Sequence, residues 1–343
     1  MTASGVDTSA AAVPGTPDTA APARTLVAGI DVGGTKVLGV LVDPADPTVV
    51  VDDGKVPTPD GAAPVLDAMA SVVREMAGRS PLPVASVGVG IAGLVDRTGV
   101  LRVGPNLPGL HDVHVGRELA RRLGLPVRVD NDATCAAWGE HLAGAARGVT
   151  DAVCVTLGTG IGAGIVADDE LVRGAHGFAG EAGHMVVDPD GPLCPCGQRG
   201  CWERFASGSG LGRLGREAAE AGRFPRGVEL AGTAGAVQGE HVTDAATEGD
   251  AAALAVLADF AGWVALGLGN LVTLLDCSLV VIGGGLVEAG DVLIDAVRTA
   301  YPARVMSPGA RPDVRILAAE LGERAGAIGA ALLGGREAHV PGA

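Results

Sequence analysis

Four side chains of the kinds that bind zinc lie close together in this sequence, at His184, Cys194, Cys196 and Cys201. Three thiolates and one imidazole complete a tetrahedral Zn²⁺ shell and leave no position open for a substrate. The short spacing, with glycines around the cysteines, therefore predicts a structural zinc site and not a catalytic one. The alternative is a set of unrelated free thiols. The other cysteines lie in apolar segments and are expected to be inert packing residues, at Cys135, Cys154 and Cys277.

Two carboxylates flank this cysteine-rich stretch. Glu181 precedes His184 by three residues, and Glu203 follows Cys201 by two. A loop held by a metal would keep both carboxylates rigid, and rigid carboxylates suit the gripping of neighbouring hydroxyls on a sugar ring. The alternative for each is a solvated surface charge.

A third group of polar side chains, Asp130-Asn131-Asp132, lies between an expected strand at 127–129 and an expected helix at 133–146. Either aspartate could cap that helix. The functional interpretation makes Asp132 the general base that accepts a proton from a substrate hydroxyl, because phosphoryl transfer needs positioning and charge neutralisation more than covalent chemistry. Asn131 can both donate and accept hydrogen bonds, which suits a sugar hydroxyl.

Two glycine loops could hold phosphates through their backbone amides, and a third glycine loop, which follows a strand, could leave room for a flat ring or a sugar. Their candidate ligand-binding residues are Asp31, Gly33, Gly34, Thr35 and Lys36 in the first, Gly158, Thr159 and Gly160 in the second, and Gly283, Gly284 and Gly285 in the third. In the first loop Thr35 adds a hydroxyl donor, and Asp31 could reach Mg²⁺ directly or through water. The alternatives are ordinary turns in the first two loops and a tight strand–helix junction in the third.

The elements around these loops argue against the common nucleotide-binding motifs. The first loop joins apolar strands expected at 25–30 and 37–42, and the second joins strands expected at 152–157 and 165–167. A dinucleotide-binding or Walker-type loop requires a helix after its glycines, whereas a strand follows here. The repeated strand, glycine turn and strand predict two related α/β halves. Facing each other, the two hairpins could clamp a triphosphate.

Other apolar patterns complete this outline. Helices are expected at 62–77, 115–123, 251–275, from about 287, and at 325–333, and strands at 84–91, 279–282 and 314–317. The helix at 251–275 carries a set of large apolar residues near one face, at Leu254, Leu257, Phe260, Val264 and Leu268. Its apolar core is short and has polar residues at both ends, so we expect a buried helix and not a membrane span.

Composition excludes several classes of partner. The formal net charge is −15, and the sequence shows no basic cluster of the kind that nucleic acids or anionic membranes require. Residues 1–24 are rich in small and polar residues and lack the pattern of a secretory signal, which predicts a disordered tail. We therefore expect a cytoplasmic protein with reduced thiols.

Taken together, these motifs resemble the ROK family of bacterial sugar kinases and repressors, within the actin-like ATPase superfamily. The resemblance covers about 25–336 and rests on the stretches 29–36, 104–108, 131–132, 157–162, 174–184, 194–203 and 282–286. The cysteine-rich stretch is very specific to this family. The fold that the resemblance implies is actin-like, with two α/β domains and a cleft between them. The smaller would comprise 25–133 and a C-terminal helix at 318–336, and the larger 134–317, with the zinc loop at 184–203.

The resemblance also implies roles for individual residues. Asp132 would be the catalytic base for the 6-hydroxyl of glucose, and the other sugar contacts would come from Asn106, Asn131, Glu181, His184 and Glu203. His184 would use one ring nitrogen for zinc and the other for the sugar. The glycine loops would hold ATP and Mg²⁺, closure of the domains on sugar would exclude water, and a homodimer or homotetramer is expected.

The sequence departs from the family pattern at two positions, and several alternative functions are open. Leu110 stands where glucokinases of the family often have an aromatic residue, and Ala163 replaces a frequent glycine. Another acceptor, namely fructose, N-acetylmannosamine or allose, is the main rival, because a few hydroxyl contacts decide it. A repressor would need a helix-turn-helix domain before the first strand. The zinc stretch argues against polyphosphate as the phosphate donor. The presence of Asp132 argues against a sugar-binding module that has no catalytic activity.

Overall fold

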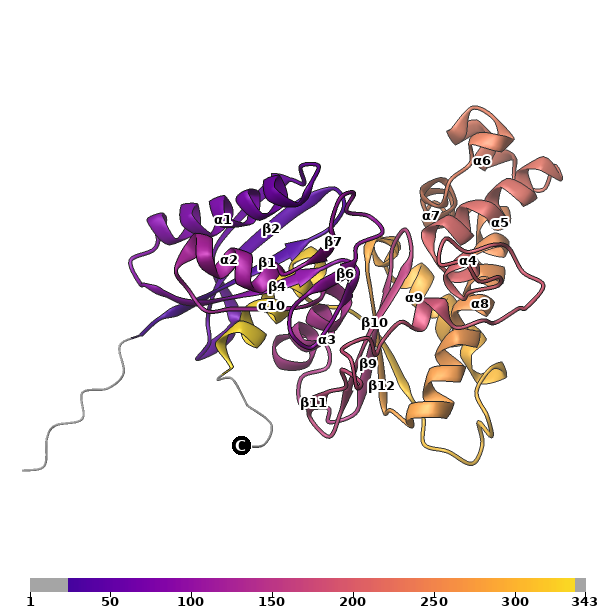
Figure 1. Ribbon diagram of the computed structural model, residues 1–343. Coiled ribbons are helices and arrows are strands. Elements are labelled where there is room, and N and C mark those ends of the chain that lie inside the picture. The colour runs from indigo at the N-terminus through magenta and orange to yellow at the C-terminus, as the bar shows by residue number, and fades with distance from the viewer. Residues whose placement is uncertain (1–23, 337–343) are drawn as a thin grey trace, which may run out of the picture.

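The computed structural model describes residues 24–336 and consists of two α/β halves, each built on a five-stranded sheet (Figure 1). The strand order is β3-β2-β1-β4-β8 in the first sheet and β11-β10-β9-β12-β13 in the second. In both, an antiparallel hairpin is extended by parallel strands, so the predicted repeat of design is confirmed. The predicted disordered tail at 1–24 lies, apart from Arg24, outside the described residues.

The first sheet comprises β1 (Leu26–Val32), β2 (Lys36–Asp43), β3 (Asp46–Pro57), β4 (Val84–Ile91) and β8 (Val127–Asn131). Helices α1 (Ala62–Arg79) and α2 (Val115–Leu123) cover one face, and α10 (Ala325–Gly335) covers the other (Figure 1). The hairpin, α1, α2, β4 and α10 agree with the sequence-based expectations. The edge strand β3 was not expected, because its residues alternate between exposed and half-buried positions and include prolines and aspartates.

A small three-stranded sheet follows β4. It comprises β5 (Leu94–Val95), β6 (Leu101–Val103) and β7 (His111–Val113). The loop between β6 and β7 carries Asn106 back to the first glycine hairpin. A Cβ atom on Gly34 would lie 2.8 Å from the carbonyl oxygen of Asn106, so only glycine permits this approach.

The second sheet comprises β9 (Ala152–Leu157), β10 (Ile161–Ala167), β11 (Glu170–Leu171), β12 (Leu279–Gly283) and β13 (Arg315–Ala318). The expectation that a strand resumes only at 165 is wrong, because Ile161 already pairs with Leu157 and the turn is confined to 158–160. Instead of a continuous helix from 287, a short 3₁₀ turn η3 (Gly285–Ala289) precedes α9 (Asp291–Ala300), and Gly290 separates them with a φ of 67°.

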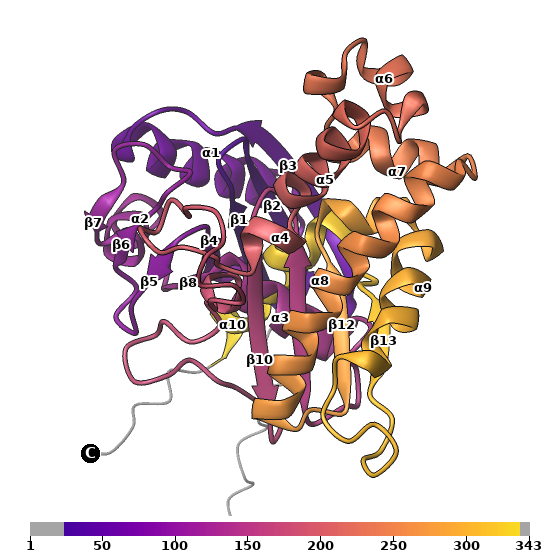
Figure 2. The same ribbon diagram turned by 90° about the vertical axis from the view of Figure 1, so that its right-hand side faces the viewer.

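Helices cover the outer face of the second sheet (Figure 2). They are α4 (Glu203–Ala206), α5 (Gly208–Glu220), α8 (Ala251–Leu275) and α9, with α3 (Asp132–Ala143) on the other face. Helices α6 (Pro225–Ala231) and α7 (Gly239–Thr247) pack on α5 and α8 beyond the end of the sheet (Figure 1). Further short 3₁₀ turns are η1 (Ala182–His184), η2 (Ala234–Ala236), η4 (Tyr301–Ala303) and η5 (Gly322–Arg324). Apart from the small sheet of β5, β6 and β7, the strands at 26–131 belong to one five-stranded sheet, and the strands at 152–171 and 279–318 belong to the other. This agrees with the predicted order of the two halves, whose exact boundaries stay a prediction.

Helix α8 is the central helix of the second core. Asp250 caps it by accepting the backbone N–H of Ala253 at 2.8 Å, and Leu257, Phe260, Val264 and Leu268 are at most 1 % exposed. Leu254, expected on the same face, is 41 % exposed, because Ala253 and Val256 take the buried positions in the first turns. The helix is long and apolar enough to cross a membrane, but half of its most apolar window is buried inside the protein, as expected for a core helix.

The two halves are joined by close packing of α3 and α10. A Cβ atom on Gly329 of α10 would lie 1.7 Å from the carbonyl oxygen of Cys135 in α3, and one on Gly88 of β4 would lie 1.6 Å from the carbonyl oxygen of Ala330. Larger residues at either glycine would force the elements apart. The glycines and alanines of α10 therefore place it in backbone contact with both α3 and the first sheet.

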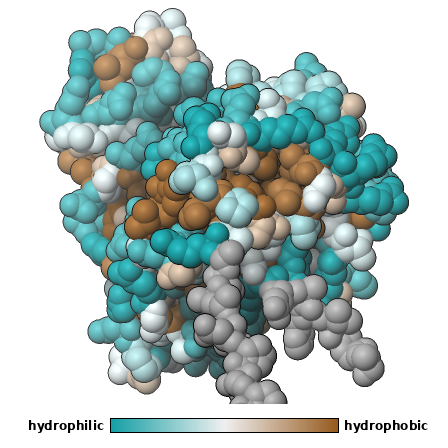
Figure 3. Space-filling model, turned by 90° about the vertical axis from the view of Figure 1, so that its left-hand side faces the viewer, coloured by the Kyte–Doolittle hydropathy of each residue, from teal (hydrophilic) through white to brown (hydrophobic). Residues whose placement is uncertain are grey.

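Figure 3 shows the far end of the first half, where a band of hydrophobic residues is bordered by hydrophilic ones. Apolar patches of this kind are frequent at interaction surfaces. The expected homodimer or homotetramer stays a prediction.

Glu140 provides a test of the link between the halves. Its side chain is fully buried and accepts backbone N–H groups of Ala145 at 2.8 Å, Leu321 at 2.9 Å and Glu320 at 3.1 Å. Replacing Glu140 by alanine should lower the free energy of unfolding by about 3 kcal/mol or more, because one buried and two partly buried backbone donors lose a charged acceptor. Denaturant unfolding measures this. The exposed Glu229→Ala variant should change it by only about 0.5 kcal/mol, and an equally small loss in Glu140→Ala would contradict the expectation.

Candidate active site

Asp132 lies where the first sheet meets α3. It follows the last residue of β8 and is the first residue of α3, partly buried at the junction of the halves. Burial raises the pKa of the Asp132 carboxyl, opposed by hydrogen bonds from the backbone at the start of α3 and from Asn131. A carboxylate held in this way can accept a proton more readily than an ordinary exposed one.

Asn131, and neither aspartate, caps α3. Its side-chain oxygen accepts the backbone N–H of Thr134 at 3.0 Å, and its amide nitrogen donates to Asp132 Oδ1 at 2.9 Å and to the carbonyl oxygen of Gly93 at 3.2 Å. Both amide hydrogens are therefore used within the protein, so Asn131 positions Asp132, and a sugar hydroxyl can meet only its oxygen. Asp130 is bound instead by Arg173, with Nε and Oδ2 2.8 Å apart.

Asp31 is the second partly buried carboxylate of the junction. It lies in β1 just before the first glycine turn, and Gly326 of α10 is so close that a Cβ atom there would lie 2.9 Å from the carboxyl carbon of Asp31. The pKa of Asp31 is raised to about 7, mainly by burial and also by the Asp132 carboxylate, while Lys36 opposes the rise. Two carboxylates that repel each other here form a donor set suited to a divalent cation such as Mg²⁺.

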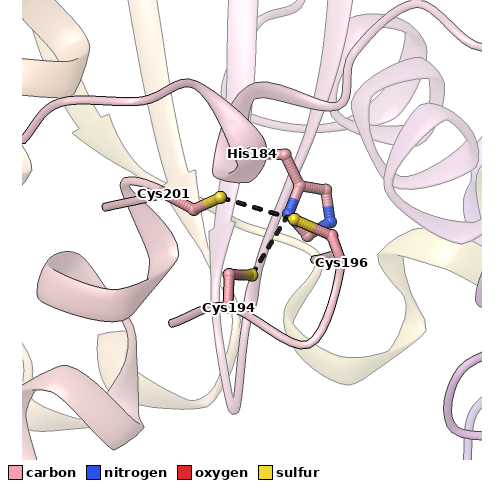
Figure 4. A group of neighbouring side chains, drawn as sticks. All are labelled: His184, Cys194, Cys196 and Cys201. Carbon is pink, nitrogen blue, oxygen red and sulfur yellow. Dashed lines mark hydrogen bonds between the residues drawn. The ribbon is translucent and has the colours of Figure 1, made fainter. Parts of the chain in front are cut away.

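The predicted zinc ligands converge in one place (Figure 4). One ligand atom from each of His184, Cys194, Cys196 and Cys201 lies within 4.8 Å of all the others. The Sγ atoms of Cys196 and Cys201 are 3.5 Å apart, and Cys194 Sγ is 3.7 Å from His184 Nδ1. A tetrahedral zinc with Zn–S bonds of about 2.3 Å would place its ligand atoms about 3.5–3.8 Å apart. The four residues therefore fit a closed zinc shell.

Both flanking glutamates lie against this cluster. Glu181 Oε2 is 3.9 Å from His184 Nε2, and Glu203 Oε1 is 3.8 Å from His184 Nδ1 and 3.0 Å from Cys194 Sγ. His184 thus presents Nδ1 to the cysteines and Nε2 to Glu181. Burial raises the pKa of Glu181, and the carboxylate of Asp132 adds to that rise. The carboxylates of Glu181 and Asp132 are therefore close enough to repel each other.

The glycine loops meet at one large cleft, which has a volume of about 1500 Å³. Of the predicted loop residues, those that line it are Thr35, Lys36, Gly158, Thr159 and Gly285. The cleft is therefore bordered by both hairpins and by the third loop, as the clamp hypothesis requires. We call it the large cleft below.

The remaining predicted loop residues support the cleft from behind or beside it. They are Asp31, Gly33, Gly34, Gly160, Gly283 and Gly284, and none of them is among the residues that line it. Gly284, with a φ of 86°, leaves room for the Leu157 carbonyl oxygen, which a Cβ atom would meet at 2.5 Å. A Cβ atom on Gly160 would lie 2.8 Å from Glu203 Oε2, so the second hairpin touches a carboxylate of the zinc stretch. Lys36 is paired with Glu323.

Several residues that line the large cleft were not foreseen. They belong mainly to α5 and α7 and include Ser209, Arg216, Gln238, Thr243 and Thr247. The start of α5 is fixed to the second hairpin, because Gly208 N–H donates to the Gly158 carbonyl oxygen at 2.8 Å and Ser209 Oγ donates to that of Thr159 at 3.1 Å. The run Gly208-Ser-Gly-Leu-Gly212 was a signal for such close packing.

Comparison with known proteins agrees with this architecture. The chain is 38% identical to the glucokinase of Streptomyces coelicolor over 310 residues, which is 89% of this chain and 96% of that protein. The crystal structure of a ROK family glucokinase from Streptomyces griseus, in complex with glucose and AMPPNP, matches with a TM-score of 0.81 and 37% identity, covering 90% of this chain and 99% of that one. A ROK hexokinase structure from Thermus thermophilus matches with a TM-score of 0.73 and 33% identity, covering 90% and 98%.

The fold is therefore that of the actin-like ATPases, with two related α/β domains and a cleft between them. Within that class the chain belongs to the ROK family, whose model matches residues 27–337.

Proposed function

We propose that this ATP-dependent sugar kinase transfers the γ-phosphoryl group of ATP to the 6-hydroxyl of glucose, with Asp132 as general base. The observation that carries the proposal is the place of the Asp132 carboxylate. It raises the pKa of Asp31 beside the first hairpin and also that of Glu181 beside the zinc cluster. A base in that position lies between a phosphate donor in the large cleft and a sugar held by the zinc stretch.

The sugar would be held by Glu181, Glu203, His184 Nε2, Asn106 and the side-chain oxygen of Asn131. Glu181 and Glu203 approach His184 from opposite ring nitrogens, so both belong to the rigid surface of the zinc stretch. Carboxylates fixed in this way can accept hydrogen bonds from neighbouring hydroxyls without losing side-chain entropy on binding. Zinc would orient these groups and would take no part in the reaction.

ATP would lie in the large cleft, with its phosphates between the two hairpins. Thr35 and Thr159, which line the cleft, would bind the phosphates through their hydroxyls and backbone amides. The N–H groups of Gly33 and Gly158 are used inside the hairpin turns, where they donate to the carbonyl oxygens of Lys36 and Gly160. The loop Gly283–Gly285 would leave room for the nucleoside. Asp31 would hold Mg²⁺, which neutralises phosphate charge when bound. A cytoplasmic location is part of the proposal, because the reaction consumes ATP.

Glucose is favoured as the acceptor because the most similar relatives given above are a glucokinase and a glucokinase bound to glucose. The test is an ADP-release assay with ATP and glucose, fructose, N-acetylmannosamine or allose at equal concentrations. In a parallel series polyphosphate replaces ATP, and formation of the sugar phosphate is measured directly because this donor releases no ADP. The highest kcat/KM should belong to glucose with ATP. A higher value for another hexose would change the acceptor, and no ADP release with any hexose would refute the kinase proposal.

Replacing Glu181 by alanine should weaken glucose binding by about tenfold or more, because a charged acceptor for a sugar hydroxyl is lost. ATP affinity should stay within about twofold, because Glu181 does not line the large cleft. Isothermal titration of each ligand measures both affinities. Glu229→Ala, at an exposed position of α6, is the control and should change neither. Equal weakening of glucose and ATP would show that Glu181 has a structural role only.

A further inference from the structure

A second cavity, with a volume of about 790 Å³, lies along β8 and shares no lining residue with the large cleft. It is bordered by β8, the start of α2, the turn before β6, β11 and the segment after it, and the end of α10. Figure 2 shows β8 and α10 side by side at this place. The walls therefore come from both halves of the protein. We call this space the arginine cavity.

Charge sets this cavity apart from the rest of the chain. Its charged lining residues are the arginines Arg97, Arg117, Arg128, Arg173 and Arg336 and the carboxylates Asp130 and Glu170. Positive charges thus exceed negative ones by three here, although the whole chain has a formal net charge of −15. The sequence showed no basic cluster because these arginines are far apart along the chain, and the fold brings them together.

Three of the arginines are held in place by acceptors in the wall. Arg173 Nε lies 2.8 Å from Asp130 Oδ2, Arg336 donates to both oxygens of Glu170 at 2.9 and 3.2 Å, and Arg97 Nε donates to the Gly174 carbonyl oxygen at 2.7 Å. A guanidinium has five N–H donors, and one carboxylate or carbonyl oxygen cannot use them all. The wall therefore fixes these side chains and leaves donors to spare for a ligand.

The start of α2 adds to the positive potential. Gly116 and Arg117 occupy the first turn of this nine-residue helix, and both line the cavity. The first backbone N–H groups of a helix have no partner within it, and the helix dipole places partial positive charge at this end. An anion in the cavity would therefore meet helix amides as well as guanidinium groups.

We propose that the arginine cavity binds a small phosphorylated molecule. A guanidinium group can donate two parallel hydrogen bonds to the oxygens of one phosphate group. A ligand with a single carboxylate would use only some of the donors that the clustered arginines offer. The volume lies within the range of about 300–1,000 Å³ that is usual for small-molecule sites. A long polyanion such as a nucleic acid is disfavoured, because it would extend from the cavity over an acidic surface. The site is separate from the large cleft and does not depend on the proposed reaction.

Titration calorimetry with inorganic pyrophosphate, in buffer without Mg²⁺, tests the proposal on the full chain. The variant combines Arg97→Ala and Arg117→Ala, which removes two exposed guanidinium groups from the cavity wall. The matched control is Arg121→Ala, one turn further along α2, where the side chain is 72 % exposed, pairs with Glu118 and does not line the cavity. Thermal unfolding of all three proteins checks that they are folded.

We expect one pyrophosphate-binding event that is present in the unmodified protein and in Arg121→Ala and is weakened by about tenfold or more in the double variant. None of these substitutions alters the large cleft, so pyrophosphate bound there would bind equally well to all three proteins. Binding that is weakened in the double variant alone can therefore be assigned to the arginine cavity. Equal affinity in the double variant and in the unmodified protein would overturn the proposal. So would equal weakening in Arg121→Ala, which would indicate attraction to general surface charge.

Discussion

Replacing Asp132 by asparagine should lower kcat for glucose phosphorylation by about 10²–10⁴-fold, the range that a positioned general base contributes. Asparagine has nearly the shape of aspartate, and its side-chain oxygen can still accept the 2.9 Å hydrogen bond from Asn131. The α3 cap, which belongs to Asn131, is unaffected. The loss should therefore appear in turnover and not in folding. The measurement is steady-state ADP release at saturating glucose and ATP.

Two further measurements separate loss of the base from damage to the site. Glucose affinity, measured by calorimetry, should change by only about threefold, because the main sugar contacts are assigned to the zinc stretch. The control Asp259→Asn, on the exposed face of α8, should keep full turnover. Turnover near that of the unmodified protein in Asp132→Asn would refute the role of Asp132. A large fall in glucose affinity with the same kcat would make Asp132 a binding residue instead.

The regular parts of the fold were predictable because their signals are local. The segments 26–43 and 152–167 each consist of an apolar run, a glycine turn and a second apolar run, and hairpins follow from that pattern whatever surrounds it. Helix 251–275 was predicted from its apolar pattern, and the structure shows that Asp250 caps it and Asp276, with a φ of 50°, terminates it. In these segments local propensity and burial favour the same structure.

The missed elements depend on contacts between distant segments. Strand β3 is an edge strand whose side chains are mostly exposed, so its register is set by pairing with β2 and not by a hydrophobic pattern. The region 208–247 is rich in glycine and alanine, and α5, α6 and α7 form there because they pack on one another and on α8. The exposure of Leu254 has the same origin, because the neighbours of α8 decide which side of its first turns is covered.

The residues of the candidate site likewise include some that were predictable from local sequence and some that were not. The zinc ligands were predictable because a metal demands particular side chains at short spacing, and the structure brings all four together. That Asn131 and neither aspartate would cap α3 was not predictable, since aspartate and asparagine are both good caps. The arginine cavity gave no signal at all, because nothing in local spacing reports that residues 97, 117, 128, 173 and 336 share one wall.

Loss of zinc should have the second large effect. Replacing Cys196 by serine removes one of four ligands, so the content should fall from about one zinc per chain to well below that value. His184 and Glu203 contact the same cluster, and Glu203 also lies against Gly160 of the second hairpin. Without the metal these groups lose their fixed positions, and a displacement of about 1 Å is enough to reduce kcat/KM for glucose by about 10²-fold. Elemental analysis and steady-state kinetics measure the two effects.

The matched control is Gln198→Ala, which alters an exposed side chain in the same turn. The backbone carbonyl of Gln198, which accepts the Cys194 N–H at 2.8 Å, is kept. This variant should retain both zinc and activity, so a loss confined to Cys196→Ser can be assigned to the metal. Removing zinc from the unmodified protein with a chelator should reproduce that loss, and adding zinc back should reverse it. A protein that contains no zinc as purified and is fully active would show that the four residues are not a metal site.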